Sequence, residues 1–223
     1  MVQVAVGSNI LSGNDLQAKQ NRSLFDKKGI LVINLMSSPG AGKTTLLERT
    51  IENLKDKVKI GVIEGDLYTD FDARRIEKKG IRVKQINTVG ACHLNADMII
   101  KVLPELGLDE LELLVIENVG NLVCPVEFDL GEDLKIVVTS TTEGNDKVHK
   151  YPLIFREANS IILNKLDLLS YTDFDLDRFK MDVARVNVLA PVFAVSCKSD
   201  IGISNWCEWL LEEVRGKKLK SMK

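Results

Sequence analysis

The chain has 223 residues, of which 45% are hydrophobic, and it carries a formal net charge of −2 at pH 7. That length suits one well-packed α/β domain, and the near-neutral charge gives no overall field that would favour nucleic acid or a membrane surface. No run of about 18 apolar residues predicts a transmembrane helix and no signal-peptide pattern opens the chain, so we expect a cytoplasmic protein whose four cysteines are thiols or metal ligands.

Residues 1–29 form a polar N-terminal arm. We expect it to be partly helical, with Asn14 or Asp15 capping a short helix. The apolar run at residues 30–36 then predicts a buried strand. This strand leads directly into the loop Ser37-Ser38-Pro39-Gly40-Ala41-Gly42-Lys43-Thr44-Thr45, which is the strongest functional signal in the chain.

A strand, a loop of small residues and the first turn of a helix together predict a phosphate cradle. We expect nucleotide contacts from Gly40, Ala41, Gly42, Lys43, Thr44 and Thr45. Lys43 would reach the β- and γ-phosphates, and the Thr44 hydroxyl would bind Mg²⁺. The pattern G-x-x-x-x-G-K-[ST] begins with a glycine where this chain has Ser37, a departure for which the sequence offers no physical reason.

Beyond the loop, apolar periodicity predicts strands and helices in alternation. The expected strands cover residues 58–63, 82–86, 111–116, 134–139, 160–163 and 191–195, and the expected helices cover 46–54, a segment between Thr69 as its cap and Gly80, 94–103 and 203–214. Such alternation predicts an α/β fold with a mostly parallel sheet, helices on both faces and ligands at the carboxyl ends of the strands. We expect the domain to span residues 30–216, with the last helix ending at Gly216 and a basic tail at 217–223.

The segment Asn164-Lys165-Leu166-Asp167 follows one of these strands and predicts a guanine site. The Asp167 carboxylate can accept hydrogen bonds from N1–H and the 2-amino group of guanine, donors that adenine lacks. Asn164 would brace the loop and the N7 side of the base, and Lys165 would lie over the ring. A second base-contacting loop is expected at Ser196-Cys197-Lys198. The nucleotide is therefore expected to be GTP, with GDP as product.

The segment from Glu117 to Gly120 is a second candidate for phosphate contacts. Glu117 ends a buried strand, where a carboxylate can hold Mg²⁺ directly or through water. The Gly120 amide can approach the γ-phosphate because no side chain blocks it. Asp66 and Asp72 are further candidates for the metal or the attacking water, although Asp72 is equally explained as a helix-capping residue. We assign catalytic roles to Lys43, Asp66, Asp72 and Glu117.

Hydrolysis is expected to be slow. Asn121 and Leu122 follow Gly120, so the glutamine that orients water in many signalling GTPases is absent there. Four cations could supply positive charge to the transition state: Lys147, Lys150, Arg74 and Arg75. Any of them could equally be an ordinary surface residue.

Cys92, His93 and Cys124 are candidate ligands for a soft metal ion. Two thiolates and an imidazole suit Ni²⁺ or Zn²⁺ and do not suit Mg²⁺ or Ca²⁺. We expect Cys92 to lie near a helix N-terminus, which would lower the pKa of its thiol. Three ligands leave a tetrahedron open, to be completed by water or by a second protomer. The alternative is two buried cysteines beside a surface histidine, and Cys197 and Cys207 are expected to be structural.

Cys124 lies four residues after Gly120 on the same short segment. If GTP draws Gly120 inward, Cys124 moves with it. Metal affinity and nucleotide state would then be coupled, and that coupling would act in both directions.

These motifs resemble the HypB family of hydrogenase nickel-incorporation GTPases, P-loop proteins of the SIMIBI class. The resemblance rests on Asn14-Asp15, Asn21-Arg22, residues 38–44, Glu64-Gly65-Asp66, Asp72-Ala73, Arg75-Ile76, Cys92-His93-Leu94, the specific run from Glu117 to Pro125, Thr142-Glu143-Gly144, Lys150-Tyr151-Pro152 and residues 164–167. It implies a GTPase that dimerises with GTP and helps deliver nickel to the large-subunit precursor of [NiFe]-hydrogenase, together with a HypA-type nickel accessory protein.

The resemblance also implies that Cys92, His93 and Cys124 bind Ni²⁺ or Zn²⁺ at the interface of a homodimer. Unlike some members of the family, this sequence has no cysteine cluster near Met1 and no histidine-rich tract. Tight nickel storage is therefore not expected.

Two other functions fit the same motifs. One is an accessory GTPase for another metalloenzyme, such as urease or a cobalamin-dependent mutase, although the urease type would carry Cys-Pro-His as one contiguous motif. The other is a metal-binding adaptor that uses GTP only to dimerise.

Overall fold

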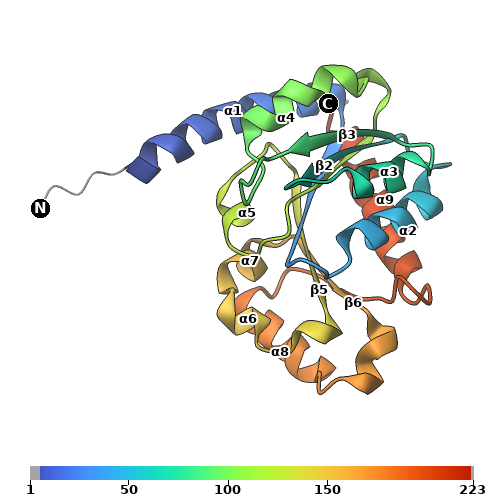
Figure 1. Cartoon of the computed structure of the whole chain (residues 1–223). Helices are drawn as coiled ribbons and strands as arrows, with labels where there is room; N and C mark the ends of the chain where they lie inside the picture. Colours follow the sequence, from blue (N-terminus) through green and yellow to red (C-terminus); the bar gives the residue numbers. More distant parts are fainter. Residues whose placement is uncertain (1–5, 222–223) are drawn as a thin grey trace, which may run out of the picture.

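The computed structural model describes residues 6–221, and its centre is a seven-stranded sheet (Figure 1). The strands are β1 (Leu31–Ser37), β2 (Ile60–Asp66), β3 (Arg82–Asn87), β4 (Leu113–Glu117), β5 (Leu134–Ser140), β6 (Ser160–Asn164) and β7 (Val192–Ala194). They lie in the order β3-β2-β4-β1-β5-β6-β7, and all neighbouring pairs are parallel. The predicted parallel α/β fold is confirmed.

Helices connect the strands and cover both faces of the sheet. The α-helices are α1 (Val6–Lys28), α2 (Lys43–Leu54), α3 (Phe71–Glu77), α4 (Ala96–Val102), α5 (Cys124–Glu127), α6 (Lys147–Lys150), α7 (Pro152–Glu157), α8 (Leu176–Val186) and α9 (Ile203–Ser221), and short 3₁₀ turns are η1 (Leu103–Glu105), η2 (Leu108–Glu110), η3 (Thr141–Glu143) and η4 (Leu166–Tyr171). The helices α2, α3 and α9 pack on one face, whereas α1 and α4 share the other face with α6, α7 and α8.

Strand β1 is buried along its whole length because it lies at the middle of the sheet. Successive side chains of a strand point to opposite faces. Leu31, Ile33 and Leu35 accordingly enter the core beneath α2 and α9, whereas Val32 enters the core beneath α1 and α4, and Met36 enters that beneath α7 and α8. The loop that follows β1 is therefore anchored from both sides.

Three local predictions were wrong. The arm forms one 23-residue helix, α1, with Asn14 in its interior rather than at a cap. Helix α3 is preceded by Asp70 rather than by Thr69. Helix α9 passes through Gly216 and continues to Ser221, because the lysines after it pair with acids of the body, as Lys217 does with Asp26 and Asp133. The differences at α1 and α9 arise from tertiary contacts that local signals do not contain, whereas at α3 Thr69 is hydrogen-bonded to the neighbouring Asp66. Within residues 6–221, no helix combines the length and the apolar character needed to cross a bilayer.

A buried hydrogen bond ties α9 to α2. The indole Nε1 of Trp206, a side chain only 1% exposed, donates to Thr50 Oγ1 at 2.9 Å. Thr50→Val should leave this indole N–H buried without a partner and lower the free energy of unfolding by about 1–3 kcal/mol. In a Trp206→Phe background, the same change should cost about 1 kcal/mol less, because no donor is stranded. Urea denaturation of the four proteins of this cycle measures the difference, and equal costs in both backgrounds would contradict it.

Candidate nucleotide and metal sites

The phosphate loop lies at the carboxyl end of β1 and opens α2, as predicted. Gly40 and Gly42 adopt positive φ angles of 77° and 100°, a conformation that side chains disfavour. A Cβ atom at Gly42 would also lie 2.5 Å from Asn164 Nδ2. Gly42 is therefore required both by the backbone and by the closeness of the base loop.

Ser37 acquires a role that the sequence did not reveal. The Lys43 ammonium, in a side chain that is only 9% exposed, donates a hydrogen bond to Ser37 Oγ at 2.8 Å. The residue that replaces the first glycine of the pattern thus holds the lysine that was predicted to bind phosphate. A buried ammonium without a partner would be costly.

Behind the loop lie two buried carboxyl groups on neighbouring strands. Glu117 accepts a hydrogen bond from Thr44 Oγ1 at 2.8 Å, and Glu64 lies beside Glu117 in the register of β2 and β4. Burial, and next the charge of Glu117, raise the pKa of Glu64 to about 11, and burial likewise raises the pKa of Glu117. The Oε2 atoms of Glu64 and Glu117 are both buried without a hydrogen-bond partner.

These groups fit a hard divalent cation. Two buried carboxyl oxygens without partners and a nearby hydroxyl are ligands that Mg²⁺ prefers, and its charge would offset the cost of burying the acids. Thr44 and Glu117, with Asp66 beside them, are the residues that would hold it. Glu64 was not predicted as a site residue from the sequence, although an acidic residue inside an otherwise apolar strand could have indicated it.

Asp66 and Asp72 both line the cavity but differ in their surroundings. Burial raises the pKa of Asp66, but the amides of Tyr68 and Thr69 outweigh this effect by donating to the carboxylate, and the net pKa is lowered. Asp66 is thus held ionised at neutral pH.

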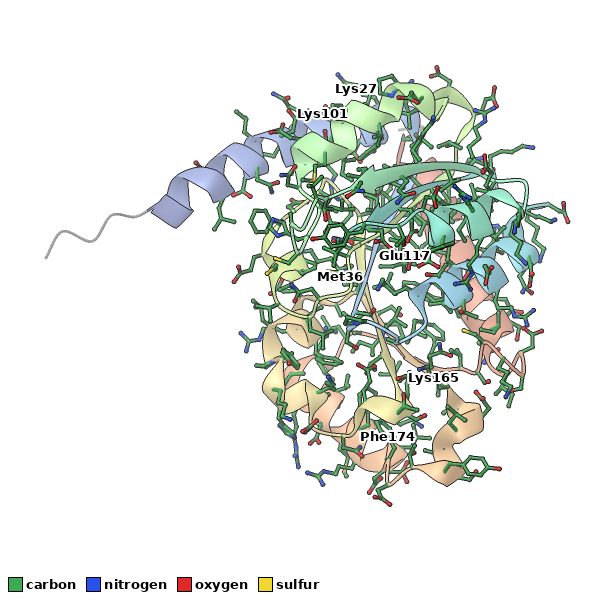
Figure 2. The ribbon with its side chains drawn as sticks, viewed as in Figure 1. Lys27, Met36, Lys101, Glu117, Lys165 and Phe174 are labelled. Carbon is green, nitrogen blue, oxygen red and sulfur yellow. The ribbon has the colours of Figure 1, made fainter. Side chains whose placement is uncertain are left out.

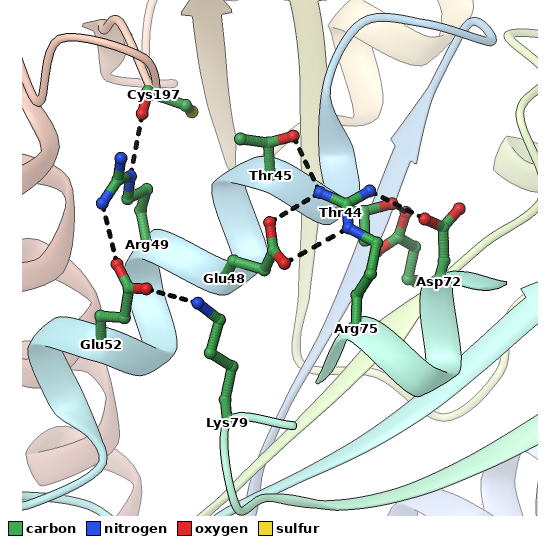
Figure 3. Close-up of polar contacts among 10 residues, drawn as sticks. Thr44, Thr45, Glu48, Arg49, Glu52, Asp72, Arg75, Lys79 and Cys197 are labelled. Carbon is green, nitrogen blue, oxygen red and sulfur yellow. Dashed lines mark hydrogen bonds and ion pairs between the residues drawn. The ribbon is translucent and has the colours of Figure 1, made fainter. Parts of the chain in front are cut away.

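Asp72 accepts a hydrogen bond from Arg75 Nη1 at 2.9 Å (Figure 3). The same guanidinium contacts Glu48 through two donors and reaches Thr45 Oγ1 at 3.4 Å. Arg75 therefore links α3 to the first turns of α2.

The cavity formed by these residues has a volume of about 500 Å³. Glu117 and Lys165, both labelled in Figure 2, take part in its lining. The remaining lining comes from the phosphate loop, residues 64–67 and 118–120, Asp72 and Arg75. Of the cations considered for the transition state, Arg75 reaches this cavity, whereas Arg74 and Lys150 pair with Asp70 and Asp146 on the surface.

The two predicted base loops meet each other. Ser196 Oγ donates to Asp167 Oδ1 at 2.5 Å, and Asn164 Oδ1 accepts from the amides of Lys165 and Cys197. Asn164 Nδ2 also donates to the carbonyl of Ala41 in the phosphate loop at 3.0 Å. The asparagine thus braces all three loops.

Cys197 and Lys198 contribute less to the predicted base site. The backbone N–H of Cys197 donates to Asn164 Oδ1, whereas its thiol is buried, and this burial raises the pKa of the thiol to about 11. Lys198 is exposed.

A second cluster forms where the loops after β3 and β4 meet. Ligand atoms of Cys92, His93 and Cys124 all lie within 4.8 Å of one another, and the two Sγ atoms are 3.0 Å apart. The ring of Phe128 stacks on His93 with centroids 3.8 Å apart. Burial lowers the pKa of His93, which keeps the imidazole neutral and able to bind a metal. The structure thus brings the three predicted ligands together.

The predicted low pKa of the Cys92 thiol was wrong. Helix α4 begins at Ala96 with Asn95 as its cap, so Cys92 lies outside the helix end. Its hydrogen bond to Cys124 and then burial raise the pKa of Cys92 instead. Metal binding at this site must therefore displace a proton from the thiol pair.

Two hydrogen bonds join this cluster to the segment that lines the nucleotide cavity. Asn118 Oδ1 accepts from the Leu94 amide at 3.1 Å, and Asn121 Nδ2 donates to the Cys92 carbonyl at 3.3 Å. A Cβ at Gly120 would lie 3.1 Å from Pro39, so the segment also packs tightly on the phosphate loop.

Residues 31–194 match the family model described as "CobW/HypB/UreG, nucleotide-binding domain". The chain is 43% identical over 210 residues to the probable hydrogenase maturation factor HypB of Methanocaldococcus jannaschii, which covers 94% of this chain and 95% of that protein. This chain belongs to the HypB branch of the CobW/HypB/UreG family.

Two further comparisons agree with this HypB membership. A hydrogenase/urease maturation factor HypB of Helicobacter hepaticus is 47% identical over 199 residues, covering 87% of this chain and 81% of that protein. The crystal structure of HypB from Helicobacter pylori in complex with nickel superposes with a TM-score of 0.87 at 41% identity, covering 92% of this chain and 97% of that chain.

The buried acid pair predicts a pH effect on the nucleotide-free protein. Glu64 keeps its proton in the folded state up to about pH 11 but releases it near 4.5 when unfolded, so the free energy of unfolding falls as pH rises between these values. Glu64→Gln removes that dependence and should become the more stable protein at alkaline pH, by at most about 1.4 kcal/mol per pH unit. Thermal melts from pH 6 to 9 measure this, with exposed Glu157→Gln as the control. Parallel curves for wild type and Glu64→Gln would contradict it.

Proposed function

We propose that this chain is a GTP-hydrolysing metallochaperone that assists nickel insertion into [NiFe]-hydrogenase. One observation carries the proposal: the cluster of Cys92, His93 and Cys124 is bonded to the segment after β4 that lines the nucleotide cavity. The names of its relatives, and the nickel in the Helicobacter pylori structure, support nickel as the cargo.

The base loops support guanine as the preferred base. Asp167 has a second oxygen free to accept from guanine N1–H and the 2-amino group, while Ser196 holds the first. Adenine would leave this carboxylate facing groups that cannot donate to it, which is a large penalty in a partly buried site.

In the proposed hydrolysis, Lys43 leaves Ser37 to bind the phosphates, and the ionised Asp66, together with Asp72, faces the water that attacks the γ-phosphate. When bound, Mg²⁺ would supply charge neutralisation at the β- and γ-phosphates. Asn121 cannot replace the missing glutamine, because its amide is bonded to the Cys92 carbonyl. This arrangement supports slow intrinsic turnover.

The thiol site supports a transient cargo. Cys92 is exposed, and three ligands leave room for a fourth from water or a second protomer. We propose a GTP-dependent homodimer that receives nickel from a HypA-type accessory protein and passes it to the hydrogenase large-subunit precursor. Zn²⁺ suits the same ligands, and the reduced thiols fit the expected cytoplasmic setting.

Two alternatives keep specific support. The name of the Helicobacter hepaticus relative includes urease, so urease maturation is a second candidate client. A metal adaptor that uses GTP only to dimerise would have the same cavity and the same thiols, and hydrolysis would be incidental to its action.

Transfer of nickel to a coloured chelator, measured with GTP and with a hydrolysis-resistant analogue, tests the proposal. Cys124→Ala should weaken Ni²⁺ binding by more than about tenfold while GTP affinity stays within a few-fold, because only the thiol site is changed.

Lys43→Ala should abolish hydrolysis and GTP-stimulated transfer. If the analogue supports transfer as well as GTP does, the adaptor function is correct; if Lys43→Ala transfers normally, the nucleotide plays no part.

Asp167→Asn should weaken GTP binding by about 100-fold, since the charged acceptor for two guanine donors is lost. Asp173→Asn makes the same charge change on an exposed residue nearby and should leave GTP affinity unchanged. Competition binding with fluorescent GDP measures both. Retained guanine preference in Asp167→Asn would exclude the assigned base contact.

A further inference from the structure

Helix α1 carries two asparagines whose side chains point into the protein. Asn14 and Asn21 are seven residues apart, which is two helical turns, so they lie on one face of α1. That face runs beside α4 (Figure 1). Asn21 is fully buried.

Each asparagine bonds to both segments that carry the thiol site. Asn14 Oδ1 accepts from the Ala96 amide at 2.9 Å, and its Nδ2 donates to the Asp129 carbonyl at 2.8 Å. Asn21 Nδ2 donates to the carbonyls of Ala96 and Leu130, both at 3.0 Å. The two side chains therefore form four bonds, two to each segment.

These anchor points border the metal ligands. Ala96 lies three residues after His93, and Asp129 directly follows Phe128, whose ring stacks on the His93 imidazole. The contact is close, because a Cβ on Gly131 would lie 2.8 Å from both Ala18 O and Asn21 Cβ.

Stability alone does not explain this choice of side chains. Ala18 and Phe25 on α1 are fully buried and supply apolar packing. A buried amide adds stability only when its partners are in place, and it fixes their positions when they are. Groups that orient metal ligands from behind act in this way.

We propose that α1 is a clamp for the thiol–imidazole site, in which Asn14 and Asn21 are positioning residues that hold the segments bearing Cys92, His93 and Cys124 at the separation one metal ion requires. The identity of that ion rests on the proposed function. The clamp itself rests on the four hydrogen bonds.

The test compares Asn21→Ala and Asn14→Ala with Gln20→Ala. Gln20 is the matched control, because it is an exposed amide side chain on the same helix. Nickel affinity and the thiolate-to-nickel charge-transfer absorption report the metal geometry. Phenylarsine oxide, which captures two neighbouring thiols, reports the Cys92–Cys124 distance without any metal, since the other two cysteines are buried. Binding of fluorescent GDP confirms the fold.

Both asparagine variants should bind Ni²⁺ about tenfold more weakly, with an altered absorption band and slower arsenical capture, while GDP affinity stays within twofold. Gln20→Ala should match wild type in every readout. Folded asparagine variants with unchanged capture and unchanged nickel spectra would overturn the clamp. If Asn21→Ala does not fold, the half-buried Asn14→Ala decides the question. If wild type binds no nickel, the proposed function fails, and the arsenical capture still decides whether α1 is a clamp.

Discussion

A hydrogen bond from Thr44, at the start of α2, to Glu117, at the end of β4, joins the phosphate loop to the segment that leads to Cys124. Asn118 continues the link, because its amide also reaches Asn34 on β1 and the backbone beside His93. The phosphate loop and the thiol site are therefore connected by a short series of hydrogen bonds.

The acids behind the loop make this joint sensitive to what occupies the cavity. A carboxyl group that is fully buried without a cation is held at a cost, and the protein meets that cost by keeping a proton on Glu64. A bound cation would change the balance of charge and remove the reason for the proton. The same residues would then respond to occupancy of the site through charge.

The sequence predicted what depends on local pattern. The order of strand, glycine-rich loop and helix at residues 31–54 was predicted, and the alternation of strands with helices predicted the parallel sheet. Asp167 and Ser196 of the two expected base loops are hydrogen-bonded to each other, and Cys92, His93 and Cys124 lie together. The predictions failed where a partner distant in sequence decides the outcome. Nothing near Asn14 shows that Ala96 and Asp129 will bond to it, and nothing near Cys92 shows that Cys124 will share its proton.

Ser37 shows how a departure from a pattern can be functional. Its hydroxyl accepts a hydrogen bond from the buried Lys43 ammonium, so this charge has a partner within the protein itself. The serine in effect competes with the nucleotide for the same lysine. A phosphate bound to Lys43 would have to displace this hydrogen bond, so the first position of the loop would weaken nucleotide binding to the extent that the hydroxyl substitutes for a phosphate oxygen.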